Sequence, residues 1–189
     1  MPIITAGKEQ IPAGKSQIAD GKKRLDEELA PLNQLKDELA GIEDEISQCD
    51  SEIAELQKQI NDGDTLYQEY TKISEPDRTP EQRVYLESWS GVRQGLEAKL
   101  AGIQEQKAQL EDKKKGLLVQ MNQAGFATEA DLEAQITSLT KQKADLDAKE
   151  KALLQQEQTL AAQEEELLSA GRQITDGKSQ IAAARTQLD

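Results

Sequence analysis

The sequence has few of the residues that usually carry chemistry. It contains no histidine, one cysteine, one phenylalanine, one tryptophan and three tyrosines. Without histidine it lacks the commonest general base and metal ligand at neutral pH, and Cys49 has no partner for an internal disulfide. With so few large side chains, the chain can bury only a narrow apolar stripe along helices. We therefore expect no catalytic residues, no metal site and no bound cofactor.

Basic surface and long apolar runs are also missing. The net charge is −13, which disfavours binding to nucleic acid and to an anionic membrane surface. No stretch approaches the ~18 consecutive apolar residues that a bilayer-spanning helix needs, and the first residues show no signal-peptide pattern. Charged residues make up 31% of the chain, a share typical of long helices and coiled coils.

What the sequence does contain is two series of aliphatic residues spaced seven apart, which mirror each other about residue 96. Helices that fold back on one another would bring the two series face to face. The predicted packing seam consists of Ile11, Ile18, Leu25, Leu32, Leu39, Ile46 and Ile53, then Leu139, Leu146, Leu153, Leu160, Leu167, Ile174 and Ile181, with Ile4, Ile60, Leu132 and Leu188 at the ends of the series. The predicted fold is all-α: a long antiparallel coiled-coil hairpin with a helical head at its far end.

Small residues occupy the second seam position near both ends of the chain. An interior glycine costs ~1 kcal/mol relative to alanine in a helix, so a run of glycines needs a compensating reason. We expect close approach of the two helix backbones; the alternative is a frayed base. The residues predicted to face one another are Gly7, Gly14 and Gly21 against Ala170, Gly177 and Ala184.

Turn and cap signals divide the chain into a first arm (1–61), a head (62–127) and a second arm (128–189). The run from Asn61 to Asp64 reads as a turn or weak point. Residues 75–80 read as a loop, after which Thr79 caps a helix with Pro80 at its first position. Gly125 is the expected end of that helix.

Proline and threonine predict two further helix boundaries and one kink. Pro12 suits a first helical turn and places the start of the first helix near residue 11, and Pro31 predicts a kink. Thr128, with Asp131 three residues later, opens the last helix. The topology of the head stays open. Either 80–123 is one helix, or the chain turns between Ser90 and Gly95, which the mirrored arms favour.

The head also holds most of the aromatic side chains. Tyr85 and Trp89 lie one helical turn apart, so both fall on one face. Packing inside the head is the favoured role, and a partner-binding surface is the alternative.

The glycine heptads carry a resemblance to known proteins. Ile4-Thr5-Ala6-Gly7, Ile11-Pro12-Ala13-Gly14, Ile18-Ala19-Asp20-Gly21 and Ile174-Thr175-Asp176-Gly177 resemble the Leu-x-x-Gly heptad repeat. That repeat occurs in extracytoplasmic segments of bacterial membrane proteins, among them FtsX-like ABC permeases, the phage-infection-protein family and some RND-type lipid transporters. The resemblance covers about 40 residues at the two termini, with isoleucine in place of leucine at most positions.

The resemblance implies an extracellular stalk on a bacterial cell membrane. It implies transmembrane helices of a parent protein on both sides of the chain, and a head that binds a protein or a component of the cell envelope. A homo-oligomer is compatible with the exposed seam positions. The competing hypothesis is a cytosolic structural or tethering coiled coil, such as part of a chromosome-maintenance or filament protein. An enzyme is not expected, because a two-helix rod offers no cleft with convergent reactive groups.

Overall fold

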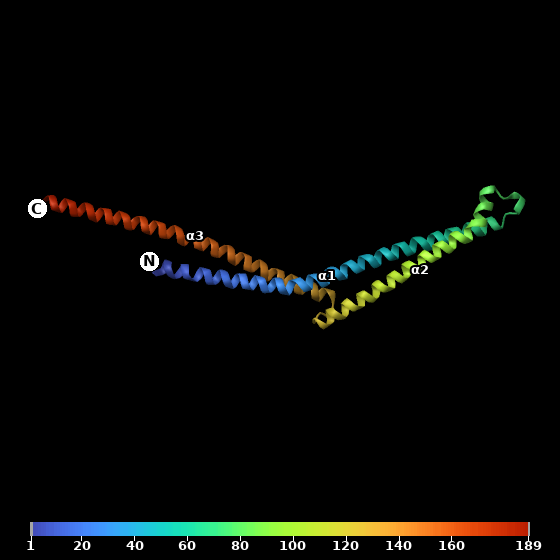
Figure 1. Ribbon diagram of the computed structural model, residues 1–189, viewed down its shortest axis with the longest axis horizontal. Helices are drawn as coiled ribbons and strands as arrows, with labels where there is room; N and C mark the ends of the chain where they lie inside the picture. Colours follow the sequence, from blue (N-terminus) through green and yellow to red (C-terminus); the bar gives the residue numbers. More distant parts are fainter. Residues whose placement is uncertain (1, 189) are drawn as a thin grey trace. The chain divides into compact units, whose positions relative to one another are not determined.

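The described part of the computed structural model comprises residues 2–188, with side chains described for 7–185, and it is helical almost throughout. The elements are α1 (Pro2–Thr71), the short 3₁₀ helix η1 (Glu75–Asp77), α2 (Pro80–Gln123) and α3 (Glu129–Leu188) (Figure 1). The all-α prediction is therefore confirmed, and the long helices pair as antiparallel neighbours. The side chains of Ile4 and Leu188 lie outside the described residues.

The predicted caps are present at both inter-helix connections. The Thr79 hydroxyl accepts from the Gln82 amide, and the Gln82 side chain accepts from the Thr79 amide at 3.0 Å, so a complete capping box starts α2. Thr128 and Asp131 exchange the equivalent bonds at the start of α3. Gly125 between the two helices has a φ of 94°, a conformation that favours glycine.

Three predicted interruptions are wrong. Residues 61–64 lie inside α1, Pro12 lies inside α1 rather than at its start, and residues 90–95 lie inside α2. Residues with low helix propensity end a helix only where no contact with another helix offsets that low propensity. At Gly63 that packing is visible, because Trp89 of α2 contacts it. The alternative in which 80–123 forms one helix is the correct one.

The chain divides into two units, at positions that differ from the predicted arms and head. Unit 1 joins Met1–Pro31 with Ala134–Asp189, and unit 2 is Leu32–Glu133. The predicted head, 62–127, is thus grouped with the second half of the first arm. The head and this part of the first arm form one unit, because α2 packs along α1.

Unit 2 is an antiparallel pair of α1 and α2, closed by the connection around η1 (Figure 1). Ion pairs join α1 to α2 in reverse order along the chain, at Asp64–Arg93, Asp50–Lys107 and Glu43–Lys114. The buried side chains between them include Cys49, Ile60 and Leu110. Where α2 ends, Leu39, Met121 and Leu132 are each at most 2% exposed, so the first turn of α3 is anchored in this unit.

Unit 1 is an antiparallel pair of the first part of α1 with α3 (Figure 1). Ile11, Ile18, Leu29, Ile136 and Leu139 are its buried residues. Contacts between the helices reach from Asp26–Lys143 to Lys8–Glu164. The start of α1 and the later part of α3 therefore run toward the same end of the unit.

The predicted seam is buried in α1 but only in the first half of α3. In α1 the seam residues are buried or half-buried: Ile11, Ile18, Leu25, Leu32, Leu39, Ile46 and Ile53. In α3 the burial holds for Leu139, Leu146, Leu153 and Leu160. Leu167, Ile174 and Ile181 are 46%, 60% and 65% exposed, so the prediction that they pack against the first arm is wrong for this chain.

Candidate functional site

Three glycines of α1 pack against leucine side chains of α3 in unit 1. A methyl group built on Gly7, Gly14 or Gly21 would lie 3.0 Å from a leucine Cδ1, contributed respectively by Leu160, Leu153 and Leu146. The leucine tips occupy the space that a side chain on α1 would need. These glycines therefore have a packing reason, since leucine side chains of α3 lie against them. The predicted short distance between the two backbones stays a prediction.

The predicted partners of these glycines are wrong. Ala170 and Ala184 are exposed, and a methyl group on Gly177 would meet nothing within 4 Å. The glycines face larger leucines nearer the middle of the chain instead. The second seam position of α1 therefore faces the aliphatic position of α3, whereas the prediction paired the second seam positions of both helices with each other.

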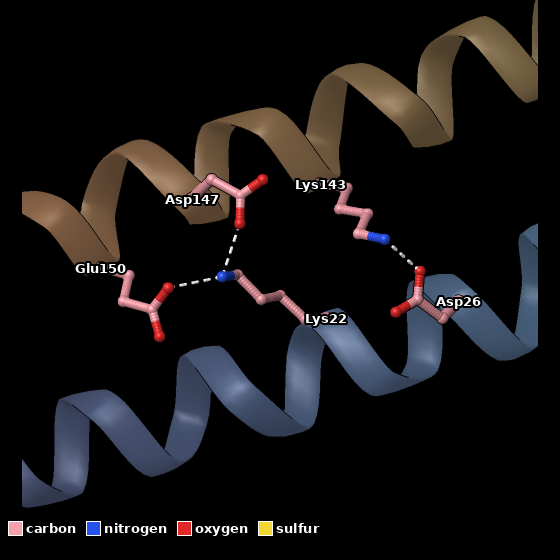
Figure 2. Close-up of polar contacts among 5 residues, drawn as sticks. All are labelled: Lys22, Asp26, Lys143, Asp147 and Glu150. Carbon is pink, nitrogen blue, oxygen red and sulfur yellow. Dashed lines mark hydrogen bonds and ion pairs between the residues drawn. The ribbon is translucent and has the colours of Figure 1, made fainter.

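A ladder of lysines and carboxylates flanks the glycine contacts. Lys8 pairs with Glu164, and Lys15 pairs with Glu157 at 2.6 Å. Lys22 reaches Asp147 at 2.5 Å and Glu150 at 2.6 Å, as Figure 2 shows. Lys22 donates hydrogen bonds to both carboxylates. The bond to Asp147 has the largest effect, followed by the bond to Glu150, and both raise the pKa of the Lys22 ammonium above its ordinary value.

The sequence carries a signal for this ladder that our sequence-based prediction did not use. Each lysine directly follows one of the three seam glycines, and the partner glutamates recur every seven residues at 150, 157 and 164. Flanking charges in a coiled coil set partner choice and orientation.

The polarity of the ladder changes along the chain. In unit 1 α1 supplies mainly the bases, although Asp26 pairs with Lys143 at 2.5 Å (Figure 2). Between α1 and α2, α1 supplies the acids and α2 supplies the bases, as at Asp50–Lys107 (2.6 Å) and Asp64–Arg93 (3.1 Å). Pairing the lysine-rich start of α1 with α2 would place like charges together. The ladder thus selects which helix pairs with which part of α1.

The aromatic residues hold the distal end of the α1–α2 pair together. Tyr85 stacks on Trp89 with ring centroids 5.6 Å apart and packs edge-on against Tyr70 at 5.5 Å. The Tyr85 hydroxyl donates to the Gly63 carbonyl at 2.8 Å, and the Trp89 indole donates to Asp64 at 2.9 Å. Burial raises the pKa of Tyr85 above its ordinary value.

Their predicted core role is correct, and the alternative of a partner-binding surface is wrong for Trp89. Its side chain is 6% exposed, with its polar atom satisfied inside the chain. Tyr85 is half-buried. Such a cluster stabilises the hairpin and leaves little area for a ligand.

The remaining surface offers grooves rather than an enclosed site. Among residues 7–185, no cluster of cysteine or acidic side chains has the arrangement of a metal site. No described helix contains a segment apolar enough to cross a membrane. One groove along unit 2 is lined by half-buried Leu56 and Ile103 beside Gly102, and a second is lined by Ile42, Leu117 and two glycines.

No protein-family model, curated protein or solved structure matches this chain.

Proposed function

We propose that this chain is the extracytoplasmic stalk of a bacterial membrane transporter of the permease type, a non-catalytic spacer flanked by transmembrane helices of its parent protein. The observation that carries the proposal is the course of unit 1. The start of α1 lies beside Glu164 of α3, so the first part of α1 and the later part of α3 run toward the same end of the unit. An insertion between two membrane helices requires its two ends to return to one side.

The glycine heptads support the same function. Those of α1 lie where α1 begins, and there Gly7 and Gly14 pack against leucine side chains of α3. Close backbone packing stiffens a helix pair because it leaves few alternative rotamers and no gap between the helices. A stiff base suits a domain that keeps a distal surface at a fixed distance from the membrane.

The dimensions of the paired segments suit a spacer. In unit 1 the ion pairs extend from Lys8 to Asp26 of α1, a rise of about 27 Å. In unit 2 they extend from Glu43 to Asp64, a rise of about 32 Å. The hairpin tip around η1 would present the surface for a protein or cell-envelope partner.

Labelling the full gene product in bacterial cells tests this function. The exposed Gln104 is replaced by cysteine in a Cys49→Ala background and treated with a membrane-impermeant maleimide. The proposal expects labelling without rupture of the cytoplasmic membrane. Labelling only after that membrane is broken would support the cytosolic tethering coiled coil instead. The Cys49→Ala chain without Gln104→Cys is the matched control for background labelling.

A further inference from the structure

One face of unit 2 carries two apolar grooves in line, called together the groove, with no ion pair across it. The residues that line it recur at helical spacing on both helices. They are Glu38, Gly41, Ile42, Glu45, Ser51, Glu52, Glu55 and Leu56 of α1, and Lys99, Gly102, Ile103, Lys113, Gly116, Leu117 and Gln120 of α2. The pairs Glu43–Lys114 and Asp50–Lys107 fall on the other side of the seam by helical periodicity. One side of the helix pair therefore carries ion pairs between α1 and α2, and the other side carries the apolar groove.

Glycines on this face have no packing reason inside the chain. A methyl group on Gly41, Gly102 or Gly116 would meet nothing within 4 Å, whereas Gly14 and Gly63 abut a leucine and a tryptophan. Interior glycine weakens a helix relative to alanine. Their open side lies beside half-buried Ile42 and Leu117, which leaves room for another helix to approach closely.

The rims of the groove carry opposite charges. The α1 rim is acidic, with Glu38, Glu45, Glu52 and Glu55, and the α2 rim is basic, with Lys99 and Lys113. Neither Glu45 nor Lys113 belongs to an ion pair among the described residues. Glu45 and Lys113 line the same stretch of groove, and Glu55 and Lys99 line another.

We infer that this face binds a second copy of the same chain. In the resulting parallel dimer, the α1–α2 pair of one copy packs face to face on the α1–α2 pair of the other, which makes a four-helix bundle. A two-fold axis along the helices places α1 of one copy over α2 of the other at the same level. Glu45 then meets Lys113 of the second copy, and Glu55 meets its Lys99. A two-fold axis across the helices would instead place acidic α1 on acidic α1, which is unfavourable.

The size of the groove predicts a weak dimer. From Glu38 to Leu56 it follows α1 for about 27 Å, and two helices are about 20 Å wide. The association then buries on the order of 1,000 Å² in total, near the lower limit for a specific interface. The interaction does not depend on the proposed stalk function.

Sedimentation equilibrium of the 189-residue chain tests the dimer. We expect a reversible monomer–dimer equilibrium, with each of Glu45→Lys and Lys113→Glu raising the dissociation constant at least tenfold. The double variant restores it to within about threefold of the original, because the charges are exchanged rather than removed. A chain that stays monomeric up to about 1 mM, or a folded double variant that fails to recover, overturns the proposal.

A steric variant and a distance measurement complete the test. Gly116→Arg fills the groove without a clash inside the chain and should abolish the dimer. Gln104→Arg, on the opposite side of α2 by helical periodicity, should leave it intact.

Spin labels at Gln68→Cys, in a Cys49→Ala background, should lie within about 30 Å of each other in a parallel dimer. An antiparallel dimer centred on the groove would separate them by about 60 Å and contradict the proposal.

Discussion

The indole ring of Trp89 in α2 lies directly against the backbone of Gly63 in α1. A methyl group on Gly63 would overlap that ring, and the indole nitrogen donates to the neighbouring Asp64 at 2.9 Å. The distal end of the α1–α2 pair therefore depends on the absence of a side chain at one position of a long helix.

We expect Gly63→Ala to destabilise unit 2 although alanine favours helix. Overpacking against a buried ring costs about 1–3 kcal/mol, while the propensity gain is at most about 1 kcal/mol. The net loss should be about 1 kcal/mol in urea unfolding followed by circular dichroism. Gly91→Ala is the matched control, because a methyl group there meets nothing within 4 Å; it should stabilise the chain. Equal stabilisation by both substitutions would contradict the contact.

The charge ladder of unit 1 should be measurable as a coupling between Lys15 and Glu157, whose charged atoms lie 2.6 Å apart. A double-mutant cycle with Lys15→Glu and Glu157→Lys should give a coupling of about 0.2–1 kcal/mol, the range for exposed pairs. The exchanged pair should recover most of the stability lost by each single variant. Replacing Glu157→Lys with Glu165→Lys provides the control, because the exposed Glu165 forms no ion pair with Lys15 and should show no coupling. A cycle with no coupling at low salt would argue against the observed register.

The Lys36–Glu133 pair in unit 2 predicts a pH dependence. Its 2.8 Å bond lowers the pKa of Glu133 below 4.5 and raises the pKa of Lys36 above 10.5. Because the folded pKa of Glu133 is depressed, its stabilisation is complete above pH 4.5 and is lost as the pH falls through the lower folded value. For Lys36 the stabilisation is complete below pH 10.5 and is lost at higher pH.

Urea unfolding of Lys36→Gln between pH 2 and 7 measures this effect. The stability difference from the unsubstituted chain should be largest at neutral pH and should shrink below pH 4.5. The exposed Lys23→Gln controls for the change in net charge, since Lys23 lies 3.8 Å from Glu27 on the same helix and, among the described residues, joins no ion pair to another helix. A difference that stays constant across the range would contradict the linkage.

The later part of α3 should exchange its amide hydrogens faster than the part paired with α1. Ile174 and Ile181 are 60% and 65% exposed, and a helix without tertiary packing is marginally stable in water. Hydrogen exchange followed by mass spectrometry should show lower protection for 168–185 than for 143–160. Equal protection in a monomeric sample would contradict the exposure of this segment.

Helix ends were predictable because short-range chemistry sets them. Thr79 and Pro80, Gly125, and Thr128 with Asp131 place the two connections where the structure has them. The same reasoning failed at Gly63 and in residues 90–95. There, a helix-breaking signal is weaker than contacts with another helix, such as that from Trp89, which local sequence does not display.

The aliphatic heptads were a sound predictor of burial in α1 and a poor one beyond Leu160 in α3. Leu153 and Leu167 have the same residue type and heptad phase, yet one is half-buried against Gly14 and the other is 46% exposed. Only the position of the partner helix separates them. The ion-pair ladder marks that position, through Lys15 and Glu157, and sequence reasoning could have found it by testing registers for opposite charges.

The helical state of the chain, the apolar stripe and the caps at the two connections follow from residues within a few positions of one another, so they could be predicted from sequence. The register depends on contacts between distant residues. The heptad pattern shows which positions of each helix are apolar, but it does not show which of them face one another, so it allowed Gly14 to face Gly177 as readily as Leu153. Leucine tips filling the space beside glycine, and lysines meeting carboxylates rather than other lysines, single out the observed pairing.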